Sequence, residues 1–219
     1  MKVCTDSCLF GAWISEKIKT TIIQPKTILD IGAGTGLLSL MIAQKSDTKI
    51  DAVEIDEKSF SQTKENFLQS PWNERLHAHH ADIKNLRSEI KYDLIISNPP
   101  FFENDLKSET KGKNLAKHHD GLTLLELVQS IKDNLSLNGD FAVLLPFHRL
   151  DHFKIIAAKN NYYLKEELLI RQTPKHSYFR SILFFGIKEV SFITNELIIK
   201  NEKGNYTEPF IFLLKDYYL

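Results

Sequence analysis

The fold class of the chain is decided by one stretch, Thr27-Ile28-Leu29-Asp30-Ile31-Gly32-Ala33-Gly34-Thr35-Gly36, in which an apolar, β-branched run ends in alternating glycines. A helical pattern over residues 37–43 follows at once. Glycine lets the backbone approach a ligand closely, and a strand, a glycine turn and a helix in this order are typical of nucleotide-binding α/β proteins. A tight strand-to-helix turn also explains the glycines alone, so other motifs must decide.

An acidic residue ends the next predicted strand, residues 49–54. Glu54 follows Gly34 by about the twenty residues that are typical of a nucleotide-binding fingerprint. A carboxylate at this place accepts hydrogen bonds from ribose hydroxyls. The dinucleotide pattern is G-x-G-x-x-G, whereas this chain has Gly32-x-Gly34-x-Gly36 followed by a leucine. The Gly-Lys-Ser/Thr ending of a phosphate-binding loop is also absent from this stretch.

A further motif, Ser97-Asn98-Pro99-Pro100-Phe101-Phe102, closes the apolar run at residues 92–96. The two prolines fix φ and supply no N–H, so the backbone stays extended and the neighbouring carbonyls have no competing donor from the prolines. The amide oxygen of Asn98 and the carbonyl of Pro99 are therefore acceptors for an exocyclic amino group, and Phe101 can stack on a planar ring. A rigid turn after a strand is the alternative interpretation.

These motifs, in this order, resemble the class I S-adenosylmethionine-dependent methyltransferases. The glycine stretch resembles their first motif, Glu54 their ribose-binding acid, and Asp82-Ile83 the segment that reads the adenine of the cofactor. The Asn-Pro-Pro-Phe stretch resembles their motif for methylating an amino nitrogen. The resemblance implies S-adenosylmethionine as the cofactor, S-adenosylhomocysteine as the product, and catalytic residues Asn98, Pro99, Pro100 and Phe101. It implies cofactor-binding residues Thr5, Asp30, Gly32, Gly34, Gly36, Glu54, Asp82, Ile83 and Asn98.

Two more segments narrow the resemblance. Residues 1–13 resemble the M-K-V-G-T-D-(G/S)-x-L-L-G-A-W opening of one bacterial family, with Cys4 where that family usually has glycine. Ser70-Pro71-Trp72 and Arg75 resemble its S-P-W-x-x-R segment. On these motifs the chain is similar to the tRNA1(Val) adenine N6-methyltransferases. This resemblance implies methylation of the adenine just 3′ of the anticodon, position 37, and a tRNA anticodon stem-loop as the partner.

Two other function classes remain open at this stage. Asn-Pro-Pro-aromatic also occurs in methyltransferases that act on protein glutamine, DNA adenine or ribosomal RNA. A non-catalytic module that binds the cofactor or RNA is the third class. The opening segment and Ser70-Pro71-Trp72 favour the tRNA enzyme over its neighbours, whereas the intact Asn98 and glycine turn disfavour a non-catalytic module.

The composition predicts a single methyltransferase domain over residues 1–219. Apolar residues make up 42% and charged residues 26% of the chain, as in ordinary globular domains. Because 28 basic residues balance 28 acidic ones, a broad nucleic-acid-coating surface is disfavoured. We expect no disulfide framework from Cys4 and Cys8, no metal site, no membrane span and no signal peptide. We therefore expect a cytoplasmic monomer.

Two local basic clusters are nevertheless present in the sequence. One lies in the polar loop of residues 103–120, where acidic residues nearly balance it, and the other in residues 171–180, where aromatics are interleaved. Such clusters suit phosphates and unstacked bases, although a solvated loop or an ion pair within the fold also explains them. The residues predicted to contact RNA are Lys107, Lys111, Lys113, Lys117, Arg171, Lys175 and Arg180.

The hydrophobic periodicity predicts an α/β, class I methyltransferase Rossmann-like fold. We expect a seven-stranded, mostly parallel sheet with one antiparallel strand and with helices on both faces. Residues 1–20 form an N-terminal helical element, with the helix at 12–20, and Asn138-Gly139 forms a turn. The other predicted helices are 35–45, 57–69, 121–134, 148–160 and one at the C-terminus. The predicted strands are 26–31, 49–54, 75–80, 92–97, 141–145, 162–171 and 180–188, with a further strand at 196–200 before a turn at 203–205.

Overall fold

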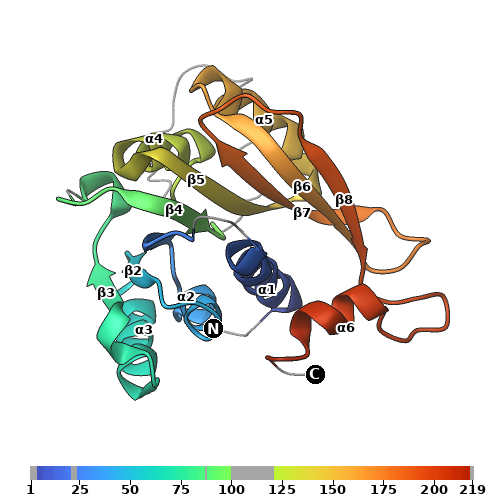
Figure 1. The fold of residues 1–219 in the computed structure, drawn as a ribbon, viewed down its shortest axis with the longest axis horizontal. Helices are drawn as coiled ribbons and strands as arrows, with labels where there is room; N and C mark the ends of the chain where they lie inside the picture. The colour runs from blue at the N-terminus through green and yellow to red at the C-terminus, as the bar shows by residue number, and fades with distance from the viewer. Residues whose placement is uncertain (1–3, 21–23, 87, 100–120, 218–219) are drawn as a thin grey trace, which may run out of the picture.

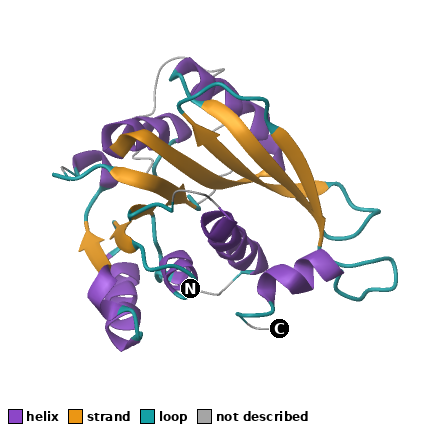
Figure 2. Cartoon of the chain, viewed as in Figure 1, coloured by secondary structure: helices purple, strands orange, loops and turns teal. Residues whose placement is uncertain are grey.

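The strands of the protein form one sheet that is covered by helices on both faces (Figure 1, Figure 2). The computed structural model describes residues 4–20, 24–86, 88–99 and 121–217. The predicted loop 103–120, with Lys107, Lys111, Lys113 and Lys117, lies outside the described residues, as do Pro100 and Phe101.

The sheet contains eight strands in the order β3-β2-β1-β4-β5-β7-β6-β8. Of these, only β7 runs antiparallel to its neighbours, which confirms the single reversed strand. The eighth strand, β8, begins before the predicted 196–200 and pairs parallel with β6 at the sheet edge. The bounds are β1 Thr27–Ile31, β2 Lys49–Glu54, β3 Leu76–His80, β4 Tyr92–Ser97, β5 Leu135–Pro146, β6 Tyr163–Arg171, β7 Tyr178–Gly186 and β8 Ile193–Ile198.

Two apolar clusters hold the helices to the sheet. The first joins one face to α1, α2, α3 and α6, and the second joins the other face to α4 and α5. Because β-strand side chains alternate between faces, Ile28 and Leu29 belong to different clusters. The helices are α1 Thr5–Thr20, α2 Leu37–Ala43, α3 Glu57–Gln69, α4 Leu124–Asn134, α5 Leu150–Lys159 and α6 Glu208–Leu214.

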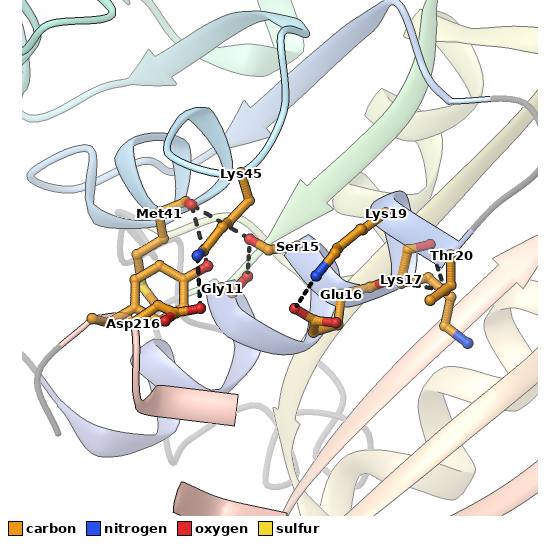
Figure 3. A network of polar contacts seen from close by, with 10 residues as sticks. Gly11, Ser15, Glu16, Lys17, Lys19, Thr20, Met41, Lys45 and Asp216 are labelled. Carbon is orange, nitrogen blue, oxygen red and sulfur yellow. Dashed lines mark hydrogen bonds and ion pairs between the residues drawn. The ribbon is translucent and has the colours of Figure 1, made fainter. Parts of the chain in front are cut away.

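The first helix is longer and more deeply buried than predicted. It begins at Thr5 rather than near Ala12, and its buried residues do not follow one stripe but run without a break from Cys8 to Ser15. Helix α1 packs against α2 and α6, so its middle is enclosed on several sides, whereas its C-terminal end carries the polar residues Glu16, Lys19 and Thr20 (Figure 3). The neighbouring ion pair between Lys45 and Asp216, 2.7 Å long, ties the end of α2 to the C-terminal segment.

The predicted turn at Asn138-Gly139 is wrong. Both residues lie within β5, which follows α4 directly. The pairing of β5 with β4 shifts register there: Tyr92 pairs with Leu135, and Leu94 pairs with Asp140. The β5 segment between these two pairs is therefore longer than the β4 segment that it faces. A bulge of this kind bends a strand without ending it, and turn-forming residues are compatible with either structure. Farther on, the predicted turn near Gly204 is confirmed, with φ of 83° at that glycine.

The sheet topology brings the predicted motifs to one edge. Strands β1, β2, β4 and β5 are parallel, so their C-terminal ends lie together, as expected for ligand sites in open α/β sheets. Strand β7 is reversed and therefore begins at this same edge, where Arg180 pairs with Pro146 of β5.

Candidate active site

The glycine turn between β1 and α2 adopts backbone angles that favour glycine. The φ angles of Gly32, Gly34 and Gly36 are 71°, 61° and 78°, all in the left-handed region. The turn crosses to the next strand, because the N–H groups of Gly32 and Ala33 donate to the Val53 carbonyl at 2.9 and 3.1 Å. A Cβ on Gly36 would lie 2.6 Å from a ring carbon of Phe67, whereas a Cβ on Gly32 would meet open space. The turn thus presents free space at Gly32.

Glu54 lies beside this turn at the end of β2. Its Oε2 accepts a hydrogen bond from Gly34 N at 2.7 Å, and its Oε1 accepts one from Asp56 N at 2.9 Å. Asp56 itself caps α3 by accepting from Ser59 N at 2.8 Å. These backbone donors fix the carboxylate, and each oxygen keeps a second lone pair for a ligand hydroxyl.

Asp30 is the most unusual ionisable group of the site. Its side chain is fully buried, and Ser39 Oγ donates to its Oδ2 at 2.7 Å. Its Oδ1 has no hydrogen-bond partner in the part of the chain that the structure describes. Burial raises the pKa of Asp30 to about 7, against the opposing effect of the Ser39 hydrogen bonds, and the charge of Glu54 raises it further. A cationic ligand group nearby would compensate this buried carboxylate.

The segment after β3 is held against Glu54 by a backbone bond from Ala81 N to the Glu54 carbonyl, 3.1 Å long. Asp82 is half-buried and caps a short 3₁₀ turn by accepting from Lys84 N at 3.0 Å. Ile83 is buried and belongs to the core beneath the turn. The structure therefore brings the predicted ribose and adenine residues together at adjacent strand ends.

These residues fit S-adenosylmethionine. Glu54 supplies acceptors for ribose hydroxyls, and Gly32 leaves room for close approach. The unpartnered oxygen of Asp30 suits a cofactor that carries both an ammonium and a sulfonium group. The remaining predicted cofactor residue, Thr5, is exposed at the first position of α1.

Asn98 and Pro99 follow β4 at the same edge. The Ser97 hydroxyl donates to the Ile31 carbonyl at 2.9 Å and so links the end of β4 to the start of the glycine turn. Asn98 is half-buried, and its Nδ2 donates to Ser7 Oγ of α1 at 2.9 Å. This bond leaves the amide oxygen as an acceptor. The sequence did not predict the role of Ser7, whose only signal is its place in the opening motif.

The three described residues predicted to contact RNA have different surroundings. Arg180 Nε donates to Asp6 Oδ2 at 2.7 Å, so this side chain is bound to the start of α1. Arg171 pairs with Glu196 at 2.8 Å and lies over the ring of Tyr178. Lys175 is largely exposed, 3.9 Å from Glu202. Of these three side chains, Lys175 alone has the character of an exposed loop cation.

The described part of the chain offers neither a clustered metal site nor a membrane-spanning helix. Within the described ranges, no group of three or more His, Cys, Asp or Glu side chains is arranged to hold a metal ion. Across those same ranges, no helix combines the length and the apolar character that crossing a bilayer requires.

Known proteins resemble this chain in sequence. Residues 12–123 match the family model described as the methyltransferase small domain. The whole chain aligns with a tRNA1(Val) (adenine(37)-N6)-methyltransferase from Flavobacterium johnsoniae, at 40% identity and 93% coverage of that protein. A protein of the same name from Christiangramia forsetii is 37% identical, with 100% of this chain and 91% of the relative covered.

Solved structures show the same fold at lower identity. A predicted O-methyltransferase from Agrobacterium tumefaciens superposes with a TM-score of 0.72 at 14% identity, covering 96% of this chain and 95% of that one. The glycopeptide N-methyltransferase MtfA, solved with S-adenosylmethionine, gives 0.60 at 9% identity, covering 81% and 94%. The fold is thus that of the class I methyltransferases, and the chain belongs to the tRNA1(Val) (adenine(37)-N6)-methyltransferase family.

Proposed function

We propose that this protein transfers a methyl group from S-adenosylmethionine to the exocyclic N6 of adenine 37 in a valine tRNA. The observation that carries the proposal is the position of Asn98 and Pro99. They follow β4 at the sheet edge that also holds the glycine turn and Glu54. The full-length relatives named for this reaction support the same substrate over protein, DNA or ribosomal RNA.

Asn98 and Pro99 act on the amino group. The N6 lone pair of adenine is delocalised into the ring and is a poor nucleophile. Hydrogen bonds from its two N–H groups to Asn98 Oδ1 and to the Pro99 carbonyl favour a pyramidal nitrogen. They strengthen as positive charge develops during attack, so they stabilise the transition state. S-adenosylmethionine supplies an electrophilic methyl group on a sulfonium.

The cofactor residues hold the reactants in line. Glu54 and the glycine turn fix the nucleoside end, and Asp30 faces the cationic end. Thr5, Asp82 and Ile83 complete the proposed contacts. The methylated ammonium is acidic enough to lose its proton to water, so the site requires no strong general base. Positioning is then the main contribution of the protein to the rate.

We assign RNA binding to the basic residues predicted from the sequence and to the aromatic residue of the Asn-Pro-Pro-Phe motif. We expect Phe101 to stack on the target base, which contributes roughly 1–3 kcal/mol, and we assign Pro100 to the same catalytic motif. An anticodon loop presents such a base at low cost, because it is single-stranded. Lys175 binds the RNA backbone, and Arg171 and Arg180 do so from their ion pairs. The remaining proposed contacts are Lys107, Lys111, Lys113 and Lys117. We also propose that the protein is cytoplasmic and acts as a monomer.

The test combines one variant with one altered substrate. Asn98→Ala removes an acceptor whose hydrogen bond strengthens in the transition state, so turnover should fall on the order of 100-fold, whereas cofactor affinity should barely change. Valine tRNA with guanine in place of adenine 37 should accept no methyl group. If that tRNA is methylated as well as the natural one, the target base lies elsewhere. If only protein or ribosomal RNA is labelled, the neighbouring classes are correct.

A further inference from the structure

The first turn of α1 is joined to the catalytic strand end and to β7 by a chain of hydrogen bonds. Arg180 Nε donates to Asp6 Oδ2 at 2.7 Å, and Ser7 N donates to Asp6 Oδ1 at 3.0 Å. Asn98 Nδ2 then donates to Ser7 Oγ at 2.9 Å. Three elements that are remote in sequence thus meet beside the amide that binds the substrate amine.

The orientation of the Asn98 amide decides what it can do. The terminal torsion of asparagine is broad and roughly two-fold, so an unrestrained amide presents either its oxygen or its NH₂ group. Only the oxygen can accept a hydrogen bond from the adenine amino group. In the structure Ser7 Oγ accepts from Nδ2, so Oδ1 is the atom of the amide that is left to accept from the substrate.

The surroundings of Ser7 make it a rigid partner. Cys8, Leu9 and Phe10, the next three residues of α1, are no more than 3% exposed, so this part of the helix is fixed by the core. The side chains of Asp6 and Arg180 are 15% and 27% exposed, so their ion pair is partly shielded from solvent. A group held by packing and by further hydrogen bonds can keep a neighbour in a productive geometry.

We propose that Ser7 is a positioning residue, which orients the Asn98 amide for the incoming amine, and that Asp6 and Arg180 hold Ser7 in place. The proposal rests on the proposed role of Asn98 as an amine acceptor. It gives Arg180 a second task besides the RNA contact predicted from the sequence, since it anchors the element that touches Asn98.

The main test is Ser7→Ala, assayed by methyl transfer to valine tRNA and by calorimetric titration of S-adenosylhomocysteine. Loss of one orienting hydrogen bond should lower kcat about tenfold. The KM for tRNA and the affinity for the cofactor product should stay unchanged. Ser7→Thr keeps the hydroxyl and should recover most of the lost turnover.

Ser15→Ala is the matched control on the same helix. The Ser15 hydroxyl donates to the Gly11 carbonyl at 2.8 Å and lies against α2 (Figure 3), with no hydrogen bond to Asn98. Its loss should lower Tm without changing kcat. If Ser15→Ala lowers kcat as much as Ser7→Ala does, a general loosening of α1 explains both results and the positioning role is wrong.

A double-mutant cycle separates this inference from the proposed function. Once Asn98→Ala has removed the amide, adding Ser7→Ala should cost no further turnover, because the two changes act through one group. An equal fold-loss from Ser7→Ala in both backgrounds would overturn the positioning role. If Asn98→Ala alone retains wild-type turnover, the amine-acceptor mechanism fails first. If Asn98→Ala is slow but Ser7→Ala is not, only the positioning role fails.

Discussion

Replacing two glycines of the same turn by alanine should have different consequences, because the added Cβ meets buried side chains at Gly36 and open space at Gly32. At Gly36 the φ of 78° disfavours an L-residue, at a cost of about 1–2 kcal/mol. The new Cβ would also lie 2.6 Å from Phe67 and 3.0 Å from Thr63. Both neighbours are no more than 3% exposed, and overpacking of such a site costs about 1–3 kcal/mol. Gly36→Ala should therefore destabilise the fold by about 3 kcal/mol.

Gly32→Ala meets the same backbone strain without the clash. With φ of 71° and nothing within 4 Å of the added Cβ, its cost to folding should be only about 1 kcal/mol. The methyl group instead enters the space that we assign to the cofactor. Affinity for S-adenosylhomocysteine should fall at least about tenfold, since each 1.4 kcal/mol of overpacking is tenfold in binding.

Thermal unfolding without ligand and calorimetric titration together check this pair. For a chain of this size, about 3 kcal/mol corresponds to a Tm lowered by roughly 6–12 °C, and about 1 kcal/mol to roughly 2–4 °C. An unchanged Tm for Gly36→Ala would show that the side chains of Phe67 and Thr63 can move away from the added Cβ at little cost in free energy. Gly32→Ala with wild-type affinity would show that the cofactor does not approach this part of the turn.

Three other predictions concern charge. Asp30 has a pKa raised to about 7, so the folded state loses stability relative to Asp30→Asn as pH rises from about 4 to 7. The full loss is about 4 kcal/mol, and a pH-independent difference in urea unfolding would contradict it. The hydrogen bond with Asp51 raises the pKa of His79 above the ordinary histidine value of about 6.5. The stabilisation from this pair is therefore fully present below about pH 6.5 and should be lost as the pH rises through the raised pKa. Denaturation of His79→Gln at several pH values should show no such loss. Arg180→Ala should lower stability by about 1–3 kcal/mol, because the partly buried Asp6 carboxylate loses its ion-pair partner. Lys175→Ala should instead leave Tm unchanged and weaken tRNA binding in filter assays.

The sequence predicted most of the sheet because its signals are local. Glycines at 32, 34 and 36 and the acid at 54 mark strand ends through backbone geometry and spacing, and the structure brings them together as expected. The β5 bulge was missed because Asn138-Gly139 suits a bulge as well as a turn. Strand β8 was placed too late because its first four residues are exposed and carry no alternation.

The start of α1 shows what local signals cannot supply. Residues 5–11 lack an apolar stripe, because the helix is enclosed by α2 and α6, and both partners are distant in sequence. The same enclosure places Ser7 against Asn98, ninety-one residues away, and Asp6 against Arg180, 174 residues away. Hydrogen bonds of such separation follow from tertiary packing, not from any pattern within a window of sequence. Arg180, which the sequence predicts to contact RNA, can therefore also hold the start of α1 in place through its ion pair with Asp6. Only the fold shows that this arginine is paired within the protein.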